Sequence, residues 1–176
     1  MATQPTQGFL ARVAGKTKQI FGLAISTGAA DAGKLIATDS SGKLDMSLMP
    51  TGIGANTISC PASEAIGAGK FVNFHSNAGA INVRLADNSN ARQADGYLKD
   101  AVASAGQATV YPLDTTNSAL TGLAPGSRYW LGTAGGVIAA PLDSADTASA
   151  GKICQELGVA KSETELVTDD LGFVGL

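Results

Sequence analysis

Few residues of this chain have side chains that act as nucleophiles, general bases or ligands of soft metals. The sequence holds a single histidine, His75, and two cysteines, Cys60 and Cys154. A Ser-His-Asp or Cys-His site would need His75 as its base. His75 lies on an expected strand beside aromatic neighbours, where a surface or packing role is usual. These three residues do not have the ligand spacing of a zinc site, so we predict no catalytic residue, no metal and no cofactor.

Two segments approach the glycine-rich motif that binds nucleotide phosphates. Gly28 to Lys34 fits G-x-x-x-x-G-K, but Leu35 occupies the position of the Ser or Thr whose hydroxyl holds Mg²⁺. The segment AGKT, which ends at Thr17, has Leu10 where the first glycine belongs. A phosphate-binding loop also needs a preceding buried strand and a following helix, and neither segment has them. We expect no nucleotide binding.

The carboxylates do not form a recognisable catalytic pattern. They are scattered along the chain, and adjacent pairs such as Asp169 and Asp170 fall in expected loops. Two acids can converge from anywhere in a fold, so a glycosidase pair stays open at this stage. Nothing in the sequence favours one, and we predict that the protein is not an enzyme.

Short apolar segments separated by turn residues predict the architecture from about Ala55 onward. KFVNFH and INVRL alternate in polarity and flank the turn signal Asn77-Ala78-Gly79, which predicts a hairpin. Spacing of about 8–12 residues between such segments is typical of sandwiches and barrels. We predict an all-β fold, a compact sandwich or barrel of short antiparallel strands. Further strands are expected in DGYLKDAVA, ATVYPL, SRYWLG, GVIAA, ICQELGVA and TELVT.

The first 54 residues differ from this pattern, and we predict that they form an extended N-terminal arm and linker, with the β domain at 55–176. One short extended segment is expected around Ile20, Phe21, Leu23 and Ile25, although a helical turn would also fit. The following residues, Gly33 to Gly54, are rich in Gly, Ser and Pro, which interrupt regular pairing.

Composition and charge favour a protein that assembles with others. Charged residues make up 15% of the chain, against about 25% in ordinary soluble domains. Residues 1–50 carry five cations and three anions, or +2, and residues 51–176 carry seven cations and twelve anions, or −5. The N-terminal part could therefore meet an acidic surface. Its cations form no cluster or stripe of the kind that binds nucleic acid.

The sequence also argues against membrane insertion, export and disulfide formation. No segment approaches the ~18 apolar residues of a membrane span, and the N-terminus lacks the pattern of a secretory signal. Because two cysteines make no disulfide framework, we expect Cys60 and Cys154 to be reduced, buried thiols.

Three segments together resemble the capsid decoration proteins of tailed bacteriophages, which are also called cement or head-fibre proteins. They are GKLIATDSSGKLDMSLMPTGIG, LTGLAPGSRYWLGTAGGVIAAP and CQELGVAKSETELV. In that family an N-terminal segment attaches to the particle, and a linker with repeated G-K-Leu elements leads to a compact β domain. Gly33 to Gly54 supplies the linker elements, and Leu120 to Leu131 matches the motif L-T-G-L-x-P-G-x-x-Y-x-L. Similar linkers also occur in tail fibres, so head and tail attachment stay open here.

The resemblance implies a virion structural protein on the outer surface of the capsid, made in the host cytoplasm and bound to the major capsid protein. It also implies a homo-oligomer, with a trimer suiting local three-fold positions and a dimer fitting equally well. Turn residues in Gly33 to Gly54 suppress autonomous folding, while its leucines and methionines can be buried on contact with a partner. Our candidates for capsid contacts are Phe9, Leu10, Arg12, Lys16, Lys18, Ile20, Phe21, Leu44, Leu48 and Met49.

One aromatic pair supports an alternative function. Tyr129 and Trp130 are neighbours on an expected strand, so their rings point to opposite faces, one into the core and the other outward. An exposed ring here could serve a partner interface or bind a sugar. The alternative function is therefore a receptor- or glycan-binding module of a phage fibre.

Overall fold

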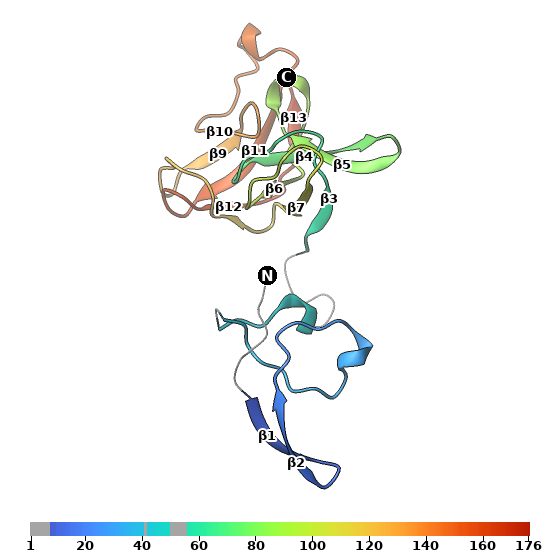
Figure 1. Ribbon diagram of the computed structural model, residues 1–176. Coiled ribbons are helices and arrows are strands. Elements are labelled where there is room, and N and C mark those ends of the chain that lie inside the picture. The colour runs from blue at the N-terminus through green and yellow to red at the C-terminus, as the bar shows by residue number, and fades with distance from the viewer. Residues whose placement is uncertain (1–7, 41, 50–55) are drawn as a thin grey trace. The chain divides into compact units, whose positions relative to one another are not determined.

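The computed structural model describes residues 8–40, 42–49 and 56–176 (Figure 1). The chain divides into two compact units, Met1–Gly54 and Ala55–Leu176. The described residues form strands and short 3-10 helices, with no α-helix among them, and the paired strands within each sheet run antiparallel. The predicted all-β fold is therefore confirmed. The 3-10 helices are η1 (Ala29–Asp31), η2 (Met46–Leu48), η3 (Asn88–Asn90) and η4 (Thr147–Ser149).

The C-terminal unit contains two sheets. The five-stranded sheet has, in spatial order, β3 (Ile58–Pro61), β7 (Gln107–Tyr111), β6 (Gly96–Leu98), β4 (Phe71–Asn77) and β5 (Ala80–Leu85). The main path of the second sheet has β10 (Val137–Ile138), β9 (Arg128–Leu131), β11 (Ile153–Ala160), β12 (Leu166–Thr168) and β8 (Thr116–Asn117). A sixth strand, β13 (Phe173–Gly175), pairs with the beginning of β11.

The central part of the five-stranded sheet is buried on both faces, which explains the apolar residues at successive positions of its strands. Phe71 and Tyr97 belong to a core that also contains residues of β9, β11 and β12, so this core lies between the two sheets. Their neighbours Val72 and Leu98 belong to a second core on the opposite face. Alternate residues of a strand point to opposite faces, so apolar residues at successive positions fill both cores.

The predicted hairpin is present as β4 and β5. Its strands pair from Val72 opposite Leu85 to Asn77 opposite Ala80. The two loop residues, Ala78 and Gly79, both have positive φ angles, of 50° and 83°. Positive φ at both positions gives the type I′ turn, whose twist matches that of paired strands.

The described part of the N-terminal unit contains a hairpin where the sequence predicted one extended segment. β1 (Gly8–Val13) pairs with β2 (Lys16–Phe21) across a two-residue turn, Ala14 and Gly15, with φ angles of 52° and 78°. Ala-Gly is a weaker turn signal than Asn-Gly or Asp-Gly, so the sequence did not predict this hairpin.

Residues after the hairpin are held by local contacts. Leu23 forms a parallel bridge with Ile36, in which the Leu23 amide donates to Leu35 O at 2.7 Å and the Ala37 amide donates to Leu23 O at 3.0 Å. Among the residues of this unit whose burial is described, only Gly22 and Ala24 are buried. The unit therefore has almost no apolar core of its own.

Candidate functional site

The β1–β2 hairpin exposes several large apolar side chains. Leu10 is 79% exposed, Phe21 57% and Phe9 50%. Such large side chains normally lie in a core, and a two-stranded hairpin alone is marginally stable in water. Exposed apolar surface of this density marks an interaction site.

Cross-strand pairs divide the hairpin side chains between two faces, because directly opposite residues point the same way. Face A contains the pairs Phe9–Ile20, Ala11–Lys18 and Val13–Lys16. Face B contains the pairs Gly8–Phe21, Leu10–Gln19 and Arg12–Thr17. Each face thus combines large apolar side chains near the open end of the hairpin with cations nearer the turn.

The hairpin is purely basic. Gly8 to Phe21 contains three cations and no Asp or Glu. Arg12, Lys16 and Lys18 are exposed, and none takes part in an ion pair within the described part of the chain. Unpaired cations beside apolar side chains fit a partner surface that is both acidic and apolar.

The segment after the hairpin has more local order than its turn-rich sequence predicts. Asp31 accepts hydrogen bonds from Lys34 Nζ at 2.6 Å, from the Thr27 amide at 2.6 Å and from Thr27 Oγ1 at 2.9 Å. These bonds favour the charged carboxylate, and the bond from Lys34 contributes most to lowering the pKa of Asp31 to about 2. Lys34, the lysine of the motif that resembles a phosphate-binding loop, is thus bound to a carboxylate of its own chain.

The structure places seven of the ten proposed capsid contacts on the hairpin and three in the segment that follows. Phe9, Leu10, Phe21 and the three cations are exposed, and Leu44 is 45% exposed. Ile20, Leu48 and Met49 are half-buried. Val13 and Ile36 are also exposed and were not among the candidates; the apolar alternation of GFLARV is the signal that would have identified Val13.

Tyr129 is the member of the aromatic pair whose ring points into the core, so of the two possible exposed aromatics, Tyr129 and Trp130, only Trp130 remains. Tyr129 is 6% exposed and packs in the core between the two sheets. Its hydroxyl accepts a hydrogen bond from the Ala124 amide at 2.8 Å, which ties β9 to the turn around Pro125 and Gly126. Trp130 points to the other face of the same strand and is half-buried.

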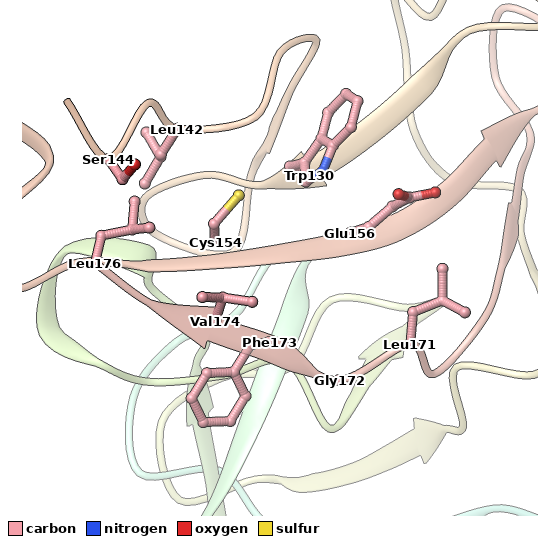
Figure 2. Close-up of a pocket in the computed structure, with 10 residues that line it drawn as sticks. All are labelled: Trp130, Leu142, Ser144, Cys154, Glu156, Leu171, Gly172, Phe173, Val174 and Leu176. Atoms are coloured by element: carbon pink, nitrogen blue, oxygen red, sulfur yellow. The ribbon is translucent and has the colours of Figure 1, made fainter. Parts of the chain in front are cut away.

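Trp130 borders an open groove on the outer face of the second sheet (Figure 2). The groove has a volume of about 370 Å³. Figure 2 shows β9 and β13 on opposite sides of β11, with Cys154 and Glu156 on the groove side of β11. Glu156 forms an ion pair with Arg128. Most of the remaining lining is apolar and comes from Leu142, Leu171, Phe173, Val174 and Leu176.

Comparisons with known proteins give a match among solved structures but none among family models or curated proteins. No protein-family model matches the chain, and no curated protein matches it. Among solved structures, the chain is similar to the head fiber gp8.5 N base of bacteriophage phi29, with 16% sequence identity and a TM-score of 0.43. The match covers 68% of this chain and 99% of that chain.

His75, the one residue that could serve as a catalytic base of the triad type, bonds to a serine. Its Nε2 lies 2.8 Å from Ser63 Oγ, and its Nδ1 lies 3.2 Å from the carbonyl oxygen of Ser76. A carbonyl oxygen only accepts, so Nδ1 donates and Nε2 accepts from Ser63. The partner of His75 Nδ1 is thus a backbone carbonyl, whereas in a Ser-His-Asp site it is the carboxylate of the aspartate.

The two cysteines are free, and burial differs between them. Cys60 is buried, which raises the pKa of its thiol, and Cys154 is half-buried in the groove. Within residues 8–40, 42–49 and 56–176, no cluster of three His, Cys, Asp or Glu residues is placed to hold a metal ion. In the same residues, no helix has the length and apolar character needed to span a membrane.

Proposed function

We propose that this protein is a non-enzymatic structural protein of a tailed-phage virion that binds the outer surface of the capsid. Its N-terminal unit contacts the major capsid protein, and its β domain faces outward. The sequence resemblance to decoration proteins supports this role. The observation that carries it is the β1–β2 hairpin, whose large apolar side chains are exposed on both faces. Burying these side chains on a partner stabilises the bound state by about 25 cal/mol per Å² of apolar surface.

Docking of this kind stabilises a shell by mass action. A protein that binds only the assembled shell lowers the free energy of that state. A hairpin and a following segment that contact different subunits bridge them, and many copies on one particle add avidity. A trimer at local three-fold positions suits this role, and a dimer is compatible with it.

The docking surface is tested with undecorated shells and a variant carrying Leu10→Ser and Phe21→Ser. Because both side chains are exposed, the variant keeps its fold, and we expect its affinity for shells to fall at least ~100-fold. The matched control is Ile81→Ser, which removes an exposed apolar side chain, 52% exposed, from the β domain. Removal of residues 2–50 should abolish binding. Shell binding that survives both changes would contradict the proposed docking surface.

The groove beside Trp130 is a candidate place for the alternative receptor- or glycan-binding function. Its lining contains Glu156 and Ser144 as polar contacts, and most of the other side chains are apolar. A sugar site needs several hydrogen-bonding groups around an aromatic ring, so this lining favours a protein partner.

A further inference from the structure

The C-terminal strand β13 presents an open edge beside the groove. Within the described part of the chain, β13 pairs with β11 alone. The Leu176 amide donates to Lys152 O at 2.9 Å, so the backbone groups of Leu176 face β11. The backbone groups of Gly175 and Phe173, one and three positions earlier, therefore point away from β11. An edge of this kind is a template for pairing with a strand of another chain.

Exposed apolar side chains surround this edge. Val174 is 64% exposed, Leu171 56% and Phe173 48%. Val174 lies opposite Cys154 and shares the groove side of the sheet with it, whereas Phe173 points to the other side of β13 (Figure 2). A strand added at this edge would find apolar contacts on both faces.

Acidic side chains lie at and beside the groove. Glu156 lines it and is paired with Arg128, and two further acids, Asp169 and Asp170, are consecutive in the chain. The last two are exposed and directly precede the groove residue Leu171. The hairpin contains three exposed cations and no acid. The two surfaces of one chain are therefore complementary in charge, and both expose large apolar side chains.

We propose that the groove beside β13 of one copy receives the β1–β2 hairpin of a second copy. Face A of the hairpin, with Phe9 and Val13, covers the groove. Its two lysines, Lys16 and Lys18, meet Asp169 and Asp170.

This contact goes beyond the proposed docking on the capsid and is compatible with it, because the hairpin has two faces. Face B, with Leu10, Phe21 and Arg12, stays available for the shell. Each copy thereby links its neighbour to the capsid. A head-to-tail contact of this kind joins two different surfaces, so it generates a ring when the rotation between copies closes.

Charge exchange provides the first test, with self-association of the full chain measured by sedimentation. The variant with Lys16→Glu and Lys18→Glu should associate about tenfold more weakly, because like charges then face each other. Adding Asp169→Lys and Asp170→Lys should restore association. The control, Lys43→Glu with Lys99→Glu, makes the same change in net charge elsewhere and should associate as the natural chain does. The proposal would be overturned if the natural chain stays monomeric. It would also be overturned if adding Asp169→Lys and Asp170→Lys does not restore the association that Lys16→Glu and Lys18→Glu weaken.

Cross-linking identifies the two surfaces directly through the native cysteine of the groove. One chain carries Phe9→Cys and Cys154→Ser, and the other is the natural chain, whose Cys154 lines the groove. Under mild oxidation we expect a mixed dimer in which position 9 of the first chain is bonded to Cys154 of the second. Substituting Ser for Cys154 in the second chain should remove this product. A mixture that yields no such bond counts against the proposal.

The single tryptophan separates this contact from sugar binding. Trp130 borders the groove, so its fluorescence should change as the chain associates, and the change should be lost with the Lys16→Glu, Lys18→Glu variant. A change produced by N-acetylglucosamine oligomers in the monomeric chain would overturn the proposal in favour of a glycan site. Binding to shells through face B is measured separately. A glycan site in the groove would therefore overturn the contact between copies and leave the proposed docking on the capsid untouched.

Discussion

Buried amide side chains connect segments of the β domain that are distant in sequence. Gln155 accepts from the Ala94 amide at 2.7 Å and donates to the Ala94 carbonyl at 2.9 Å, so its side chain replaces a missing strand pair. Asn117 donates to Gly69 O at 2.9 Å and accepts from the Ala119 amide at 3.1 Å. Both residues are at most 2% exposed. Buried polar groups are costly unless they are paired, so these bonds fix the loops that they join.

Replacing Gln155 by Met should lower the free energy of unfolding by about 2–3 kcal/mol, because two backbone groups of Ala94 lose their partners inside the protein. The measurement is urea unfolding followed by Trp130 fluorescence. Gln107→Met is the matched control at an exposed position of β7, with an expected change within about 0.5 kcal/mol. Equal stabilities of the two variants would show that the Gln155 bonds are not a main contribution.

The pH dependence of the N-terminal unit should centre on Asp31. Its pKa in the folded chain is lowered from 3.8 to about 2, first by the bond from Lys34. The carboxylate therefore stabilises the turn above pH 3.8, and this contribution is lost as the pH falls through about 2. We expect the carboxyl carbon of Asp31 to titrate near pH 2 in an NMR experiment. Lys34→Met should move the midpoint up toward the ordinary value; an unchanged midpoint would exclude the role of Lys34.

At the scale of the elements, two hairpins use the same Ala-Gly turn in different surroundings. Ala14-Gly15 closes the exposed β1–β2 hairpin, and Ala78-Gly79 closes β4–β5, whose β4 begins in the buried core. Positive φ costs an alanine about 1–2 kcal/mol relative to its ordinary conformations. In β4–β5 the packing of the sheet offsets this cost. The β1–β2 hairpin has no comparable core to offset it.

The turn of β4–β5 gives a prediction about both of its residues. Ala78→Asn should raise the free energy of unfolding by about 0.5–1 kcal/mol, because Asn adopts positive φ more readily. Gly79→Ala should lower it by about 1–2 kcal/mol, because Gly79 has a φ of 83°. No atom lies within 4 Å of a Cβ added at position 79, so backbone conformation alone is tested. Urea unfolding measures both, and a change of the same sign in the two variants would contradict the turn assignment.

At the scale of the whole molecule, the two units differ in how much they bury. The β domain has two apolar cores, one of them shared between its sheets. In the N-terminal unit, the largest apolar side chains of the hairpin lie in solvent. Because burial of apolar surface is the main stabilising contribution to folding, the N-terminal unit should open far more readily than the β domain.

Hydrogen exchange should resolve this difference. In the monomeric chain we expect amides of β1 and β2 to exchange at least ~100-fold faster than those of β9 and β11, because they open without disrupting a core. Binding to shells should slow exchange in the hairpin and leave β11 unchanged. Equal protection of the hairpin and β11 in the free chain would contradict the assignment of the hairpin as an element that is stabilised by partners.

The amino-acid sequence by itself determined the class of fold and most strands of the β domain. Alternation in KFVNFH and INVRL, with a turn signal between them, is a local property that predicts β4 and β5 without knowledge of the rest. The sequence also identified Phe9, Leu10 and Phe21 as candidate contacts, since that choice needs only residue type and position. Local periodicity and turn chemistry act over a few residues, which is why they can be read from sequence.

Only the tertiary structure decided which side chains are covered. The sequence does not show which of Tyr129 and Trp130 is buried. Contacts of β9 with the other sheet bury Tyr129, whereas Trp130 borders the groove. The pairing of β1 with β2 also depends on strand register. The open edge of β13 depends on the order of the strands in the sheet. These are long-range pairings, and a short stretch of sequence does not specify its partner.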